Sequence, residues 1–105
     1  MSDKIKDHVL SIINTLETGF GDDVNEDGQP FSAFDYLQDA LDIEWVVNSK
    51  KEYLGARILV AFGGPNIWVD TRRGIVEGAW WGDSYSRTFK DNIGLDDALQ
   101  ELHAC

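Results

Sequence analysis

The fold is most directly readable from residues 53–81, YLGARILVAFGGPNIWVDTRRGIVEGAWW. Runs rich in β-branched and aromatic residues alternate here with short turn sequences, which is typical of strands joined by hairpins. We predict strands over Tyr53–Phe62, Ile67–Thr71 and Ile75–Trp81, and a continuation of the last one after Gly82 through Phe89 stays open. Gly63-Gly64-Pro65-Asn66 and Arg72-Arg73-Gly74 supply the turns between these strands, because glycine accepts a left-handed backbone.

Before this stretch the apolar residues recur with a helical period. Lys4–Thr18 is predicted to be an amphipathic helix capped by Ser2 or Asp3. Ser32 and Asp35 resemble a capping box, so a second helix is expected from there to about Asp42. Its expected buried side chains are Phe34, Leu37, Ala40 and Leu41. After this helix the apolar residues recur at every second position, and Ile43–Ser49 is predicted to be the first strand.

The chain is predicted to end in a short helix over Leu95–His103. The element order is then α-α-β-β-β-β-α, which indicates an α+β fold: a four-stranded antiparallel meander with two N-terminal helices and one C-terminal helix. The 105 residues suit a single domain, residues 1–105. Trp45 and Trp68 are expected in its core.

The sequence points to a cytoplasmic protein. Its one cysteine, Cys105, cannot form an intramolecular disulfide, and the first residues have no apolar stretch of a signal peptide. No apolar run approaches the ~18 residues of a membrane span. We therefore expect a soluble protein.

The net charge of −10 disfavours direct contact with nucleic acid or anionic membranes and favours cationic partners. The charge is also unevenly distributed, since residues 7–49 contain ten acids and no Lys or Arg. Residues 50–90 carry seven bases and four acids, and residues 91–105 four acids and no base. Basic grooves of nucleic-acid enzymes are partners of the right charge.

A carboxylate surface is the main candidate for partner binding. On the predicted second helix, Asp35, Asp39 and Asp42 have the spacing of one face, where neighbours lie ~5–6 Å apart. An ordinary solvated face is the alternative, although such faces usually mix both signs of charge. The surface is expected to comprise Asp22, Asp23, Glu26, Asp27, Asp35, Asp39, Asp42 and Glu44.

Trp80 and Trp81 are adjacent on a predicted strand, so their rings should point to opposite sides of the sheet. Only one of them can lie under the helices. The other, taken as Trp81, is a candidate anchor for a partner, and packing against Tyr85 or Phe89 is the alternative.

Asp23-Val24-Asn25-Glu26-Asp27-Gly28 matches the first half of a calcium-binding loop. A calcium site on Asp23, Asn25 and Asp27 is thus an alternative to a plain acidic turn. The twelfth position of such a loop should be Glu, but it is Phe34 here, so no metal site or other cofactor is predicted.

The sequence gives no support for catalysis. His8 and His103 belong to different predicted helices, and Cys105 is the last residue. None of the common hydrolase, zinc-protease or dithiol motifs is present. We expect a protein without enzymatic activity.

Several segments resemble one group of small proteins: Phe34–Glu44, Gly55–Ile58, Gly63–Thr71, Val76-Glu77 and Trp80–Gly82. The group consists of small uncharacterised acidic proteins encoded on bacterial mobile elements such as phages, plasmids and conjugative elements. The chain departs from the group's pattern at Gly78-Ala79, where bulkier residues are expected. The resemblance brings no catalytic residue with it. It implies a role against host defence, of the anti-CRISPR or antirestriction type, with carboxylates standing in for nucleic-acid phosphates.

The sequence therefore predicts an acidic protein-binding inhibitor of a nucleic-acid-binding bacterial defence complex. The expected partner is a basic protein surface, with no direct contact to nucleic acid or membrane. A calcium-binding module and a homodimeric accessory protein remain as alternatives.

Overall fold

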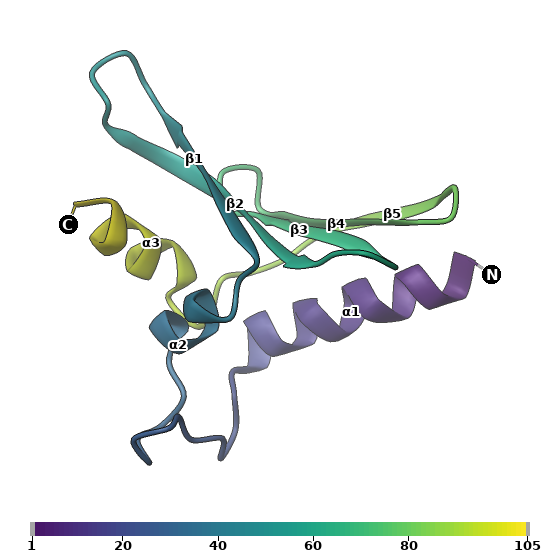
Figure 1. Ribbon diagram of the computed structural model, residues 1–105, viewed down its shortest axis with the longest axis horizontal. Helices are drawn as coiled ribbons and strands as arrows, with labels where there is room; N and C mark the ends of the chain where they lie inside the picture. The colour runs from purple at the N-terminus through teal and green to yellow at the C-terminus, as the bar shows by residue number, and fades with distance from the viewer. Residues whose placement is uncertain (1, 105) are drawn as a thin grey trace.

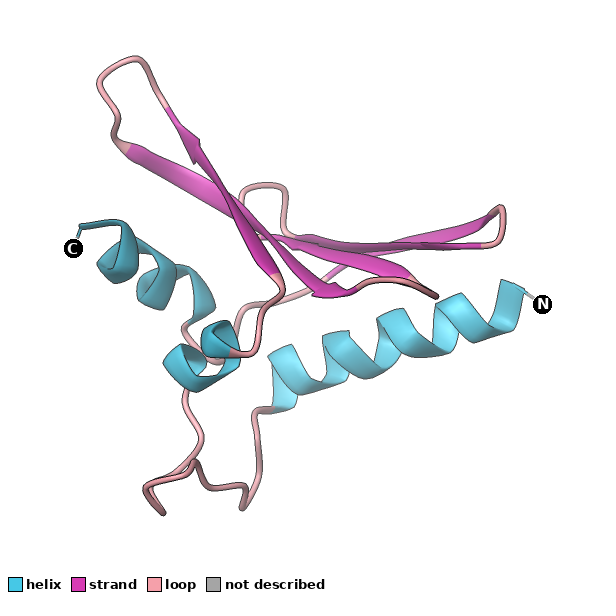
Figure 2. Ribbon diagram, in the orientation of Figure 1, coloured by secondary structure: helices cyan, strands magenta, loops and turns pink. Residues whose placement is uncertain are grey.

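The computed structural model describes residues 2–104. Its helices are α1 (Ser2–Thr18), α2 (Ala33–Gln38) and α3 (Leu95–Ala104). Its strands are β1 (Asp42–Val47), β2 (Tyr53–Ala61), β3 (Asn66–Asp70), β4 (Ile75–Trp80) and β5 (Asp83–Thr88). The strands follow one another between α2 and α3, and a long loop joins α1 to α2 (Figures 1 and 2).

The five strands form one antiparallel sheet in the order of the sequence, β1-β2-β3-β4-β5. The α+β class and the meander are confirmed, but the predicted count of four strands is wrong. Trp81 and Gly82 both have a positive φ, 52° and 86°, so the chain reverses there instead of extending β4. Residues 83–88 return along β4 as a separate strand.

The strand register assigns each side chain to one of two sheet faces. Ile58 pairs with Val69, and Val69 with Val76, so these apolar residues form a row on one face. The neighbouring residue of β2, Arg57, pairs with Glu44 and Asp70 on the opposite face. Helix α1 packs on β4 and β5, and α3 packs on β2 and α2. The helices therefore cover the apolar face, and the face of Arg57 stays open (Figure 1).

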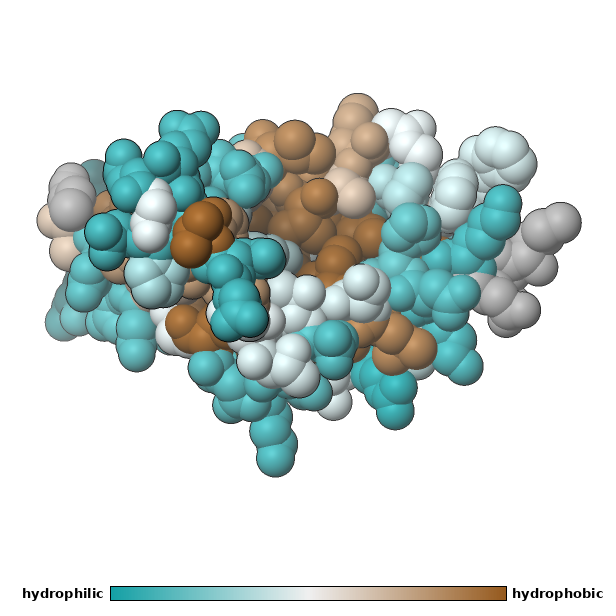
Figure 3. Space-filling model, turned by 90° about the horizontal axis from the view of Figure 1, so that it is seen from below, coloured by the Kyte–Doolittle hydropathy of each residue, from teal (hydrophilic) through white to brown (hydrophobic). Residues whose placement is uncertain are grey.

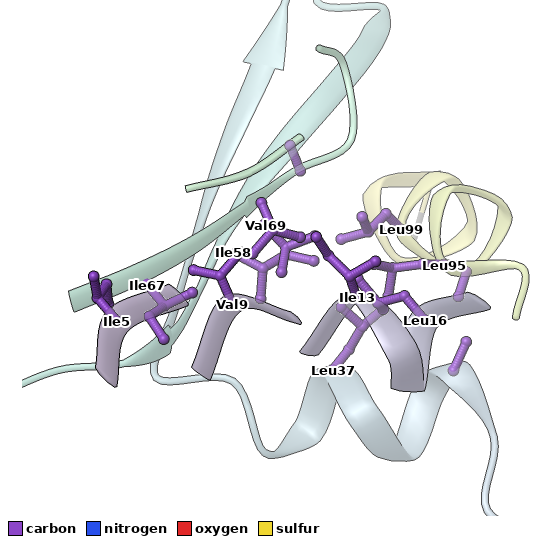
Figure 4. Close-up of a cluster of buried hydrophobic side chains, with 14 residues drawn as sticks. Ile5, Val9, Ile13, Leu16, Leu37, Ile58, Ile67, Val69, Leu95 and Leu99 are labelled. Atoms are coloured by element: carbon purple, nitrogen blue, oxygen red, sulfur yellow. The ribbon is translucent and has the colours of Figure 1, made fainter. Parts of the chain in front are cut away.

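The core lies between the helices and the covered face (Figure 4). Helix α1 contributes a stripe at helical spacing that is almost inaccessible to solvent, as predicted from its sequence. The sheet and the other helices complete one cluster. Its large members are Ile5, Val9, Ile13, Leu16, Leu37, Ile58, Ile67, Val69, Val76, Leu95 and Leu99.

The second helix is shorter than predicted. Its capping box between Ser32 and Asp35 is present, but α2 ends at Gln38 with Asp39 as its C-cap. The Asp39 N–H donates to the Tyr36 carbonyl at 3.2 Å, which tightens the last turn. The Leu41 N–H then donates to the Leu59 carbonyl of β2 at 2.9 Å. Residues that were expected to continue the helix are thus hydrogen-bonded to β2 instead.

Several residues expected in the core are not buried. Phe34, Leu41 and Trp45 are exposed, and Trp68 is half-buried on the open face of the sheet. The helices leave part of the apolar surface uncovered: seen from below, apolar side chains gather in a recess in the middle of the molecule, with hydrophilic residues on either side (Figure 3).

Candidate functional site

The loop between α1 and α2 folds into a small hairpin that carries most of the predicted acidic surface. Val24 and Pro30 form an isolated antiparallel bridge, and the Phe31 N–H donates to the Asp23 carbonyl at 3.0 Å. At the hairpin tip, the Asn25 side-chain oxygen accepts from the N–H groups of Asp27 and Gln29 at 2.9 and 3.1 Å. Backbone geometry therefore holds Asp22, Asp23, Glu26 and Asp27 in place, and their side chains are exposed.

The hairpin is anchored at its base. The Phe20 ring packs edge-on against Phe31, with ring centroids 4.8 Å apart, and lies 5.8 Å from the ring of Tyr36 in α2. The Asn25 amide also donates to the Asp35 carboxylate at 3.3 Å. The loop and α2 thus form one connected unit.

Asp35 has a structural role within that unit. Its carboxylate accepts hydrogen bonds from the N–H and the hydroxyl of Ser32, at 2.8 and 2.9 Å. The backbone N–H bond from Ser32 is the main reason that the pKa of Asp35 lies below its ordinary value, and the bonds from the Ser32 hydroxyl and Asn25 add to it. Asp35 is therefore engaged with its own chain rather than held ready for a partner.

Glu26, Asp27, Asp35 and Asp39 line one shallow concavity of about 310 Å³ between the hairpin and α2. Among the side chains of residues 4–104, every ion pair with a separation up to 4.0 Å involves Arg57 or Arg73. The acids of residues 22–39 thus form no ion pair within 4.0 Å in that range. We call Asp22, Asp23, Glu26, Asp27 and Asp39 the acidic end.

Asp42 and Glu44 do not belong to the acidic end, so the predicted helical row of Asp35, Asp39 and Asp42 does not exist. Both residues lie on β1, on the open face of the sheet. The Asp42 carboxylate accepts from the Ile43 N–H at 2.9 Å. Glu44 is neutralised by Arg57, with 3.1 Å between Oε1 and Nη1. Their position follows from the early end of α2.

The geometry gives no support to the calcium alternative. The Asn25 side-chain oxygen, which would be a ligand, already accepts two backbone N–H bonds. No group of three or more acidic, histidine or cysteine side chains suited to hold a metal ion occurs among the side chains of residues 4–104.

Trp81 is the most exposed large apolar residue described, with 93% of its surface accessible. It lies in the β4–β5 turn and not on a strand as predicted, and its ring meets that of Trp80 edge-on at 6.1 Å. Lys4, at the start of α1, lies over the Trp80 ring. The acidic end follows the other end of α1, a helix of 17 residues that spans roughly 25 Å (Figure 1). Trp81 therefore cannot share one compact contact with the acidic end.

The open sheet face holds a charge cluster that sequence reasoning missed. The Arg57 guanidinium bonds to Glu44 on β1 and Glu77 on β4, both at 3.1 Å, and stacks 4.5 Å above the Trp68 ring. Asp70 is only 3% exposed and has Arg57 and Arg73 at 4.0 and 3.8 Å. Two of the seven bases of residues 50–90, Arg57 and Arg73, are thus ion-paired within the molecule. The alternation of side chains along each strand shows which residues of that strand share a face. Which of them meet across strands depends on the strand register, and the sequence alone does not give that register.

Both histidines pack against aromatic rings of the sheet. His8 lies against the edge of Trp80, and the His103 ring packs near the rings of Trp45 and Tyr53, 5.6 and 5.8 Å away. The two belong to different helices with different surroundings, and Cys105 lies outside the described residues.

Fold and surface define a small α+β protein whose five-stranded meander is covered on one face, with an acidic end that has no ion pair among the side chains of residues 4–104. Comparison with protein-family models, with curated proteins and with solved structures finds no match for this chain. No helix in the described part of the chain has the length and apolarity needed to cross a membrane.

Proposed function

We propose that the protein is a non-catalytic inhibitor that binds through its acidic end to a basic, nucleic-acid-binding surface of a bacterial defence complex. The observation that carries the proposal is the concentration of five exposed acids at one end of the described part of the chain with no ion pair among them, while the acids that are ion-paired, Glu44, Asp70 and Glu77, all lie on the sheet. Negative potential at this end is therefore left to act on a partner.

Charge arrangement supports this proposal more strongly than total charge does. The chain from residue 7 to residue 49 has no Lys or Arg, and its α1–α2 loop concentrates four acids on one hairpin. A surface that served solubility alone would mix both signs. Carboxylates fixed on a backbone can occupy positions that phosphates take in a basic groove, which links the acidic end to nucleic-acid-binding partners.

Three of the predicted acidic contact residues leave the proposed surface. Asp42 lies on β1, on the open face of the sheet. Glu44 is paired with Arg57, and Asp35 caps α2. The remaining contacts are Asp22, Asp23, Glu26, Asp27 and Asp39, and Trp81 would touch only a partner large enough to reach the far end of α1.

The test is a pull-down from bacterial lysate with the Glu26→Lys, Asp39→Lys double variant. Its matched control is Asp97→Lys, Glu101→Lys, which changes the net charge equally at two exposed acids of α3. We expect the acidic-end variant to lose roughly tenfold or more of its partner at about 50 mM NaCl, and the control to retain it. The captured protein should bind nucleic acid, and its activity should fall when the wild-type protein is added.

Equal retention of the partner by both double variants, or binding that does not weaken as salt rises, would contradict docking through the acidic end. If the captured partner has no affinity for nucleic acid, the proposal that the protein inhibits a nucleic-acid-binding complex is contradicted.

A further inference from the structure

Strand β1 is an edge of the sheet, and β2 is its only neighbour there. Within residues 2–104 it packs extensively against no other element, and the β1–β2 hairpin extends away from the rest of the molecule (Figure 1). Edge strands offer unpaired N–H and C=O groups to another strand, and proteins usually protect them with lysine or proline. The sequence of β1, DIEWVV, contains neither.

The outer side of β1 also exposes apolar surface. Trp45 is 39% and Val47 40% exposed, and both lie on the face of the sheet that the helices cover. The opposite edge differs, because β5, DSYSRT, carries mostly polar side chains.

The sequence of β1 is complementary to itself in one antiparallel register. If two copies pair about Trp45, Ile43 faces Val47 on the covered side, and Glu44 faces Val46 on the open side. Asp42 then faces Asn48, so no two like charges meet. A register centred on Glu44 would instead place two carboxylates opposite each other, which is destabilising.

From these observations we propose that two copies of the chain pair through their β1 edges and join their sheets into one continuous antiparallel sheet of ten strands. The two Trp45 side chains meet at the two-fold axis. The contact removes the exposed parts of Trp45 and Val47 from water.

Charge opposes this dimer and gives it a recognisable signature. Each copy carries a net charge of −10, so the copies repel each other at low ionic strength. The contact itself is apolar and backbone-mediated. Association is therefore expected to strengthen between about 50 and about 500 mM NaCl, because salt screens the repulsion.

Sedimentation velocity over a concentration series, with wild type, Val47→Lys and Leu54→Lys, tests the pairing. Leu54 is 41% exposed on the same hairpin but lies on the inner strand β2, so its substitution is matched in exposure and charge. We expect Val47→Lys to raise the dimer dissociation constant by about tenfold or more, and Leu54→Lys to leave it within about threefold. A monomeric wild type at high micromolar concentration overturns the proposal, as does equal weakening by both variants.

A cysteine placed at the axis tests the register. In a Cys105→Ala background, Trp45→Cys brings two thiols directly across the new strand pair, where Cα atoms lie about 5 Å apart and a disulfide can form. Val47→Cys in the same background is the control, because its predicted partner is Ile43 of the second copy. An oxidised dimer is expected from the Trp45→Cys variant alone. Efficient cross-linking of the Val47→Cys variant, or no cross-linking of the Trp45→Cys variant, excludes this register.

The inference does not depend on the acidic end, and the two sets of experiments separate. Lysine at residues 26 and 39 should reduce capture of the partner and leave the dimer in place. Val47→Lys should weaken the dimer and leave capture of the partner unchanged.

Discussion

Trp81 combines high exposure with a backbone conformation that suits it poorly. A left-handed φ costs an ordinary L-residue about 1–2 kcal/mol, and asparagine and glycine tolerate it best. With Gly82 it forms a two-residue hairpin turn in which both residues have positive φ, where Asn-Gly is the preferred sequence. The Trp81 side chain is almost fully exposed, so its burial contributes little to the stability of the fold. This favours a role for Trp81 in contact with another molecule.

We predict that Trp81→Asn stabilises the isolated protein by about 0.5–1 kcal/mol, because asparagine relieves the strain and little packing is lost. The free energy of unfolding in urea measures the effect. A destabilised variant would show that the Trp81 ring packs against Trp80 more closely than its exposure implies.

Asp35 and Asp39 are four residues apart, yet the structure gives them different roles. We predict that Asp35→Asn lowers the free energy of unfolding at pH 7, since it weakens the cap of α2 and the tie to Asn25. Asp39→Asn, the matched control, should change stability by less than about 0.5 kcal/mol.

The pH dependence of the Asp35 effect has a definite sign. The pKa of Asp35 is lower in the folded protein than in the unfolded chain, so ionised Asp35 stabilises the fold above the unfolded pKa. This contribution is lost as pH falls through the folded pKa. The difference between wild type and Asp35→Asn should therefore shrink in acid, and a difference that stays constant to pH about 2 would contradict this assignment.

At the scale of elements, α1 approaches β4 closely because residue 78 is glycine. A Cβ placed on Gly78 would lie 2.8 Å from Ile5 Cδ1 and 3.0 Å from Val9 Cγ2, which is closer than carbon atoms pack. The absence of a side chain at residue 78 thus lets α1 lie close on the sheet.

Gly78→Ala is expected to destabilise the protein by about 1–3 kcal/mol through overpacking between α1 and β4. Gly64→Ala is the control, because its Cβ would lie 3.8 Å from the Trp80 ring, an ordinary contact. Chemical denaturation of both variants measures the difference. Equal stability of the two would mean that α1 shifts on the sheet without cost.

Helix α3 is held to the sheet by a hydrogen bond as well as by its apolar stripe. The Tyr53 hydroxyl donates to the Asp96 carboxylate at 2.6 Å, and burial and this bond raise the pKa of Tyr53. Tyr53→Phe should cost about 1 kcal/mol near neutral pH. The pKa of Tyr53 is raised on folding, so the contribution of this bond is fully present below the unfolded pKa of about 10 and is lost as pH rises through the folded pKa. The cost of Tyr53→Phe should therefore decline as pH rises above about 10. Tyr85→Phe on β5 is the control, and a cost that persists in strong alkali would argue against the bond.

Local patterns predicted α1, α3 and the strands between residues 53 and 81, because each depends on the period of its own apolar residues. The end of α2 could not be predicted, since it depends on the Leu41 N–H reaching the Leu59 carbonyl. The same is true of Glu44, whose pairing with Arg57 requires the β1–β2 register. Trp81 was assigned to a strand because tryptophan favours strands, whereas the turn uses the backbone freedom of Gly82. The acidic character of the α1–α2 loop can be read from the sequence, because a charge bias needs no tertiary contact to be seen; its role as a contact surface stays a prediction.

At the scale of the molecule, basic residues lie mainly on the sheet and at the start of α1, and acids dominate the α1–α2 loop, α2 and α3. This imbalance implies self-repulsion in the folded state. We predict that raising NaCl from about 50 to about 500 mM increases the free energy of unfolding of dilute, monomeric protein by up to about 1 kcal/mol. Glu26→Lys, Asp39→Lys should reduce this gain, because it removes charge from the densest region. A fall in stability with salt would indicate that the Arg57 ion pairs outweigh the repulsion.

The tether between Asn25 and Asp35 has a kinetic consequence. A hairpin already fixed by Asn25, Phe20 and Phe31 has little freedom to lose when it meets another protein. Electrostatic attraction between the acidic end and a basic partner then acts on a surface that already has its bound conformation. The exposed carboxylates of this surface therefore chiefly set the association rate constant. Asn25→Ala would remove the hydrogen bond to Asp35 without changing any charge, but the hairpin that carries the acids would become mobile. The association rate constant with the partner should then fall, and the dissociation rate constant should rise.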